Sequence, residues 1–140
     1  MQKVVFYEKT GSERDSGQRA LLAAAGYDIE ARDLTAEHWT PAALRAFFAE
    51  RPVCEWFDPL SPRVVSGEID PSRSNPQQAL VMLSVDPALI ASPLVKVNGY
   101  CASALGDLEL LAFVDVLARG GRPPTVYRQP ESWGEGAGGE

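Results

Sequence analysis

This chain of 140 residues opens with an apolar block, which is followed at once by a polar turn and the start of a helix. This stretch narrows the choice of folds more than any other in the sequence. The predicted strand Lys3–Tyr7 carries an unbroken run of β-branched and aromatic residues, which is typical of a central strand covered on both faces. Residues 10–12 break the apolar pattern, and Asp15 or Ser16 can cap the amides that open a helix. The N-terminus of a helix that follows a strand favours an anion or a thiolate, because its free amides and its dipole attract negative charge. Ser12 stands where that anion or thiolate would lie.

The patterns that follow predict alternating helices and strands. A helix over about residues 16–25 ends at Gly26, which supplies a left-handed C-terminal stop. A strand is then predicted over Tyr27–Asp33, with alternate apolar residues on one face. We expect the first two strands to be parallel and joined by a right-handed crossover.

Four further helical segments are expected before residue 91. The first begins at Thr40-Pro41, runs to about Glu50 and places Phe47 and Phe48 in the core. The others are predicted at Val53–Phe57, Pro76–Ser84 and Asp86–Ile90, with irregular chain around Pro59, Pro62 and Gly67.

The last part of the domain reads as a hairpin and a helix. Asn98-Gly99 is a strong two-residue turn signal, so Leu94–Val97 is expected to pair antiparallel with Tyr100–Ala102. A helix over about residues 107–118 is then ended by Gly120-Gly121. Its predicted apolar side carries Leu108, Leu111, Val114 and Leu117.

Composition and charge exclude several classes of protein. The formal net charge of −6, without a cluster of Lys and Arg, argues against a nucleic-acid partner. No signal-like start and no run of about 18 apolar residues is present, so we expect a cytoplasmic protein without a membrane partner. One domain is expected over residues 1–120, followed by a flexible Gly-, Pro- and Glu-rich tail over residues 121–140. Trp133 in that tail is interpreted as a docking motif or as an ordinary tail residue.

Five segments, taken in order, cover most of residues 1–105: FYEKTGS (6–12), QRALLAAAGYDIEARDL (18–34), WTPAALRAFFAERPVCEWF (39–57), PRVVSGEI (62–69) and DPALIASPLVKVNG (86–99). Together they resemble the arsenate reductase-like (ArsC) proteins, and among them the branch called nitrogenase-associated proteins. The resemblance implies an α/β, thioredoxin-like fold: a mixed sheet of about four strands with an inserted helical region and flanking helices. It also implies a cis peptide bond before Pro93, beside Ser12.

The residues that carry the activity of that family differ in this chain. Ser12 stands where the family has its nucleophilic cysteine, and a serine hydroxyl neither ionises near neutral pH nor forms a disulfide. Thr10 and Gly17 replace the usual Pro and Arg of the opening turn. Residues 91–93 read Ala-Ser-Pro where an Arg before the Pro would help to hold arsenate, so that bidentate guanidinium is missing. We therefore expect that the chain is not an arsenate reductase.

By the same resemblance, Arg63 is the basic residue near the anion site that survives in the alignment. No catalytic residue is assigned, because Ser12 replaces the cysteine that carries the activity of the family. The residues expected to bind a ligand or a partner are Gly11, Ser12, Glu13, Arg63, Ser92 and Pro93.

The thiols and the one histidine are given structural interpretations. Cys54 and Cys101 form no CxxC and are too few for a disulfide framework, so both are expected to be reduced. Cys101 could replace the missing redox thiol, but burial in the core is favoured for both cysteines. No metal site is expected, because His38 is the only histidine and is interpreted as a solvated residue.

The resemblance implies an accessory or regulatory protein in a nitrogen-fixing bacterium, binding a protein partner through a face near Ser12, Pro93 and the opening helix. One alternative is a glutathione-dependent oxidoreductase or transferase in which Ser12 orients the glutathione thiolate, although the favoured interpretation of Ser12 is the remnant of a lost cysteine. Another is a transcription regulator that binds RNA polymerase. That branch carries a CxxC where this chain has Lys9 and Ser12, so redox switching at this turn is excluded. Apart from glutathione, no cofactor is expected.

Overall fold

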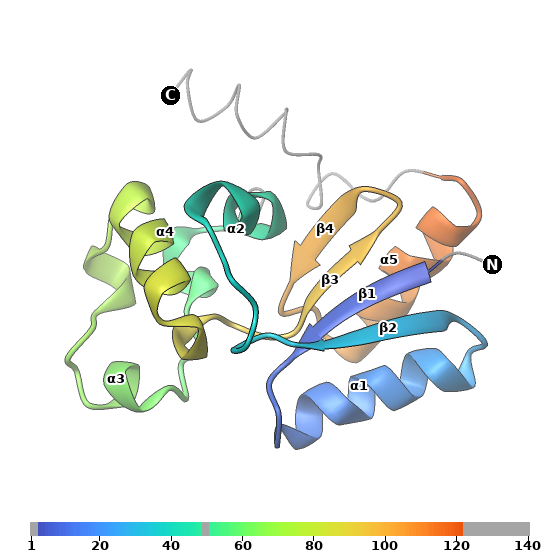
Figure 1. Cartoon of the computed structure of the whole chain (residues 1–140), viewed down its shortest axis with the longest axis horizontal. Coiled ribbons are helices and arrows are strands. Elements are labelled where there is room, and N and C mark those ends of the chain that lie inside the picture. The colour runs from blue at the N-terminus through green and yellow to red at the C-terminus, as the bar shows by residue number, and fades with distance from the viewer. Residues whose placement is uncertain (1–2, 49–50, 122–140) are drawn as a thin grey trace.

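A four-stranded mixed sheet forms the centre of the computed structural model, which describes residues 3–48 and 51–121 (Figure 1). The strand order is β2-β1-β3-β4. Strand β1 (Lys3–Glu8) pairs in parallel with β2 (Asp28–Asp33) and antiparallel with β3 (Leu94–Val97). Strand β4 (Tyr100–Ser103) pairs antiparallel with β3 at the edge. The first strand is therefore internal to the sheet, as its apolar run predicts.

Helices cover both faces of this sheet (Figure 1). Helices α1 (Glu13–Ala24) and α5 (Asp107–Ala118) pack against the face that carries Val4 and Phe6. On the opposite face lies the inserted helical region, with its largest helices α2 (Pro41–Phe48) and α4 (Pro76–Val85). The shorter elements are η1 (Val53–Trp56), α3 (Pro62–Val65), η2 (Pro71–Arg73) and η3 (Pro87–Leu89).

Aromatic side chains fill the core under the inserted region. The rings of Phe48 and Trp56 stack with their centroids 4.7 Å apart, and both side chains are fully buried. Tyr7, Trp39 and Phe47 meet edge to face, with ring centroids 5.0 to 5.8 Å apart. Such pairs add about 0.5–1.5 kcal/mol each beyond the area that they bury. The prediction that Phe47 and Phe48 belong to the core is confirmed.

The local signals for turns are confirmed. Asn98 and Gly99 both have positive φ, of 56° and 83°, as a two-residue hairpin turn with the twist of its strands requires. The Ser92–Pro93 peptide bond is cis, as the resemblance implied. The predicted tail beyond Gly121, with Trp133, lies outside the described residues.

The structure corrects the predictions for the chain around Pro62 and for the buried side of helix α5. The chain around Pro62 was expected to be irregular, but residues 62–65 form the helical turn α3, because proline is favourable in the first turn of a helix. Helix α5 has the predicted bounds, and Val114 and Leu117 are buried as predicted, but the predicted Leu108 does not belong to its buried side. Leu108 is 82% exposed, whereas Leu110, Phe113, Val114 and Leu117 are buried. Most positions of α5 are apolar, so packing against β1 and β3 selects the buried stripe.

The described residues contain no helix that combines the length and the apolar character needed to cross a membrane.

A pair of leucines on α5 tests which side of the helix is buried. Leu110→Ala removes a fully buried side chain and should lower the free energy of unfolding by about 2–5 kcal/mol. Leu108→Ala makes the same chemical change at an exposed position and should stay within about 0.5 kcal/mol of the wild type. Urea unfolding followed by circular dichroism measures both. Equal losses from the two variants would contradict the assigned face.

Candidate functional site

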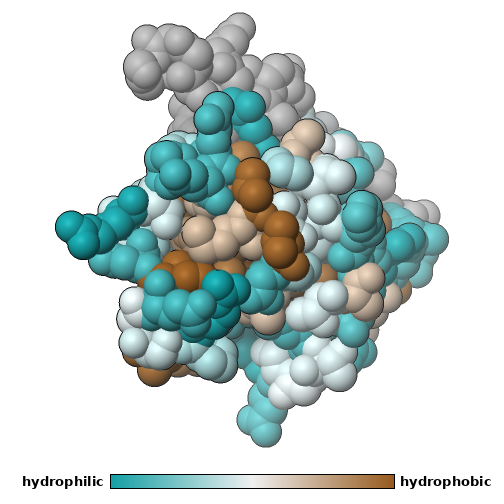
Figure 2. All heavy atoms as spheres, turned by 60° about the vertical axis from the view of Figure 1, so that its left-hand side comes forward, coloured by the Kyte–Doolittle hydropathy of each residue, from teal (hydrophilic) through white to brown (hydrophobic). Residues whose placement is uncertain are grey.

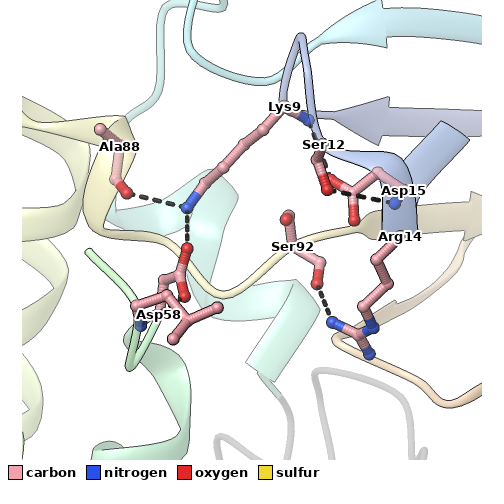
Figure 3. A network of polar contacts seen from close by, with 8 residues as sticks. Lys9, Ser12, Arg14, Asp15, Asp58, Ala88 and Ser92 are labelled. Atoms are coloured by element: carbon pink, nitrogen blue, oxygen red, sulfur yellow. Dashed lines mark hydrogen bonds and ion pairs between the residues drawn. The ribbon is translucent and has the colours of Figure 1, made fainter.

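A cleft of about 440 Å³ lies where the start of α1, the chain around η1 and α3, and the cis-proline loop before β3 meet. Ser12, Arg14 and Asp15 line one wall, and Ser92 lies beside them at the base. The opposite wall comes from the inserted region and is mainly apolar. Its apolar members are Phe57, Pro59, Leu60, Val64 and Pro71, and Arg51, Cys54, Glu55 and Asp58 line it as well. Figure 3 shows the network of polar contacts around Ser12 and Ser92, at the cleft and its edge.

Ser12 forms the N-cap of α1, and the helix begins at Glu13. Its Oγ accepts the backbone N–H of Asp15 at 3.2 Å, and its carbonyl oxygen accepts the N–H of Ser16 at 3.0 Å. The expected start near residue 16, with Asp15 or Ser16 as the cap, is therefore wrong. Gly11, at φ 89°, lets the chain turn early enough for Ser12 to take the cap position.

Asp15 lies inside the first turn of α1, with only 1% of the residue exposed. Its Oδ2 accepts the backbone N–H of Lys9 at 3.0 Å, which ties the turn before the helix to the helix itself. Its Oδ1 is buried, and no group in residues 3–48 and 51–121 donates a hydrogen bond to it. The sequence identified Asp15 only as a cap candidate and gave no sign of this burial.

Arg14 connects α1 to two segments far along the chain. Its Nη1 donates to the carbonyl of Ser92 at 3.0 Å (Figure 3), and its Nη2 donates to the carbonyl of Leu105 at 3.2 Å. The sequence analysis missed this residue. A signal was present, since the helix dipole disfavours a cation in the first turn and a tertiary contact offsets that cost.

Lys9 reaches from the same turn to the inserted region. Its Nζ pairs with Asp58 Oδ2 at 2.7 Å and donates to the carbonyl of Ala88 at 2.8 Å (Figure 3). Both charged side chains of this pair are largely buried, so solvent screens it less than an exposed surface pair. Lys9 and Arg14 thus hold the two sides of the cleft in place.

The structure brings together most of the predicted binding residues. Ser12 and Ser92 line the cleft, while Gly11 and Glu13 are exposed beside Ser12. Pro93 is buried directly after Ser92.

Arg63 lies outside the lining of the cleft. It makes ion pairs with Glu68 at 3.0 Å and with Asp86 at 2.8 Å. Both carboxylates keep the guanidinium charged and raise its pKa, with Asp86 the larger contributor. Arg63 borders a separate groove along α4, lined by Val81 and Val85, on the side of the molecule where Figure 2 shows exposed apolar side chains.

The two cysteines have opposite surroundings, and both are free thiols. The prediction of a core position is confirmed for Cys101 and wrong for Cys54, which is exposed and lines the cleft. In the tight turn η1, Trp56 takes the inward position and leaves Cys54 outside. Burial raises the pKa of Cys101 to about 11, so this thiol stays neutral at physiological pH.

Metal ligands do not gather in the described part of the chain: no group of three or more His, Cys, Asp or Glu side chains there could hold an ion. His38 is exposed, in agreement with its interpretation as a solvated residue.

A curated relative covers most of the chain. The uncharacterized 15.7 kDa protein in the draG 3' region of Rhodospirillum rubrum is 39% identical over 119 residues, which are 85% of this chain and 83% of the relative. No protein-family model matches the sequence.

Solved arsenate reductases share the fold. The arsenate reductase from Vibrio cholerae matches with a TM-score of 0.68 and 17% identity, covering 79% of this chain and 97% of the other. A possible arsenate reductase from Streptococcus mutans matches with a TM-score of 0.65 and 19% identity, covering 81% and 100%. At these identities the likeness concerns the fold alone. The predicted thioredoxin-like fold is confirmed.

The raised pKa of Cys101 predicts a loss of stability at alkaline pH. The ordinary pKa of a thiol is 9.0, whereas the folded Cys101 holds its proton up to about pH 11. Between these values the unfolded state binds fewer protons, so the free energy of unfolding should fall as pH rises, by about 2–3 kcal/mol in total. Cys101→Ala should flatten this part of the pH profile in urea titrations, and Cys54→Ala, at an exposed thiol, should not. A wild-type slope retained in Cys101→Ala would contradict the assignment.

Proposed function

This chain belongs to the same family as the uncharacterized 15.7 kDa protein of the Rhodospirillum rubrum draG 3' region, and we propose that it is an accessory or regulatory protein of nitrogen fixation. It corresponds to the nitrogenase-associated branch of the arsenate reductase-like proteins. Its thioredoxin-like scaffold binds a protein partner and does not reduce arsenate.

This proposal rests on the identity of residue 12 and on the hydrogen bond that its side chain makes. Thiol chemistry at this fold position needs a cysteine at the helix start, where the dipole stabilises the thiolate. Ser12 occupies the place and uses its oxygen to cap α1. Cys101 is in the core and neutral at physiological pH, so it does not replace the missing nucleophile.

The surroundings of Ser12 also favour the binding of a protein partner over chemistry on an oxyanion such as arsenate. The guanidinium of Arg14, two residues after Ser12, donates to the carbonyls of Ser92 and Leu105. That arrangement holds the cis-proline loop against α1. The proposed partner surface is the rim beside the cleft, formed by the exposed Gly11 and Glu13 and the half-buried Ser12.

Gene deletion and complementation in the source bacterium test the proposal. Deletion should change whole-cell nitrogenase activity, measured by acetylene reduction, and leave arsenate resistance unaltered. Glu13→Arg reverses a charge on the exposed rim and should fail to complement. Asp28→Arg makes the same charge change at the opposite end of the sheet and should complement fully, as should the double variant Cys54→Ala/Cys101→Ala. Arsenate sensitivity of the deletion strain, or full activity of Glu13→Arg, would overturn the proposal.

A glutathione-dependent activity is the second candidate, and one feature favours it. Ser12 accepts a hydrogen bond through its oxygen, which leaves its O–H proton to donate to a thiolate at the helix start. The RNA-polymerase alternative stays a prediction from the resemblance alone.

An amide-resolved NMR titration with reduced glutathione at millimolar concentration tests the second candidate. If glutathione is the ligand, the amides of Gly11, Ser12 and Glu13 shift saturably. Ser12→Ala then weakens binding by about tenfold, which corresponds to about 1.4 kcal/mol. Ser16→Ala, an exposed serine in the same helical turn, serves as the matched control. A flat titration of the wild type removes this function.

A further inference from the structure

In the cleft, the Oδ1 atom of the buried Asp15 carboxylate has no hydrogen-bond donor among the described residues. We propose that the cleft binds a small amphipathic molecule whose protonated primary amine donates a hydrogen bond to Asp15 Oδ1. This inference goes beyond the proposed function and does not depend on it, because it concerns a small ligand in the cleft and not the protein partner at its rim.

The demand for a donor follows from the contacts of Asp15. A buried acceptor without a partner is unfavourable because it has lost its hydrogen bonds to water, and the cost is larger when the acceptor is charged. The N–H of Lys9 satisfies Oδ2 and the N-terminal end of α1 supplies a favourable field, but Oδ1 has no donor in the described residues. Figure 3 shows the carboxylate beside Ser12, above the space bordered by Ser92.

The cations on either side of the Ser12 cap, Lys9 and Arg14, are directed elsewhere. Lys9 Nζ lies 2.7 Å from Asp58 Oδ2, and both terminal nitrogens of Arg14 donate to backbone carbonyls. Asp15 therefore has no ion-pair partner among the described residues, although it is 1% exposed. A ligand ammonium would supply both the missing hydrogen bond and the missing opposite charge, and such charge-assisted bonds are about twice as strong as neutral ones.

The opposite wall indicates that the rest of the ligand is apolar. Phe57, Pro59, Leu60 and Val64 line it together with the charged Arg51, Glu55 and Asp58, and Leu60 is 82% exposed in this structure. An aliphatic chain attached to the amine would cover the apolar part of this wall and remove it from water, which is favourable. The volume of about 440 Å³ lies in the range of small-molecule sites.

Titration with isoamylamine and with isoamyl alcohol, followed by amide-resolved NMR, tests the proposal on the full chain. The two probes share the aliphatic group and differ in the ammonium. The amine should bind at least about tenfold more tightly than the alcohol and shift the amides around Ser12, Asp15 and Cys54. Asp15→Asn keeps the size of the side chain and an oxygen for the Lys9 amide, and should reduce this preference to about threefold or less.

Glu55→Gln is the matched control, because it removes one negative charge from the exposed part of the same cleft. It should leave the preference for the amine within about twofold of the wild type. Equal binding of amine and alcohol by the wild type would mean that water alone satisfies Oδ1, and it would overturn the proposal without any variant. A preference that persists in Asp15→Asn would overturn it as well. Neither result bears on the complementation experiment with Glu13→Arg.

Discussion

The burial of β1 on both faces is the constraint on which the rest of the structure depends. Val4 and Phe6 belong to the core shared with α1 and α5, whereas Tyr7 packs among the aromatic side chains of the inserted region. Strand β3 divides its side chains in the same way, with Leu94 on one face and Val95 on the other. The sheet thus separates two hydrophobic cores, one on each face. The cleft lies at the edge of the sheet, near the end of β1.

Local sequence signals were sufficient to predict most of the helices and strands. They were not sufficient to predict which side of each helix faces the core. The run in β1, the Asn98-Gly99 turn and the bounds of α5 each depend on residues close together in the chain, so they could be predicted. The buried side of α5 could not, because apolar residues surround most of that helix and only its contacts distinguish Leu110 from Leu108.

The candidate site was predicted in outline and missed in its contacts. Ser12 and Ser92 were placed together by resemblance, and they do line one cleft. Arg14 was missed because its partner Ser92 is 78 residues away. Cys54 was assigned to the core because its neighbours are aromatic, yet a tight helical turn directs Trp56 inward and leaves the thiol outside.

The turn between β1 and α1 has a mechanical consequence. Lys9 holds the inserted region through Asp58, 49 residues away, and Arg14 holds the cis-proline loop through Ser92. The carboxylate of Asp15 joins these two anchor points through the Lys9 amide. Both sides of the cleft are therefore anchored to one short segment of the chain, residues 9–14.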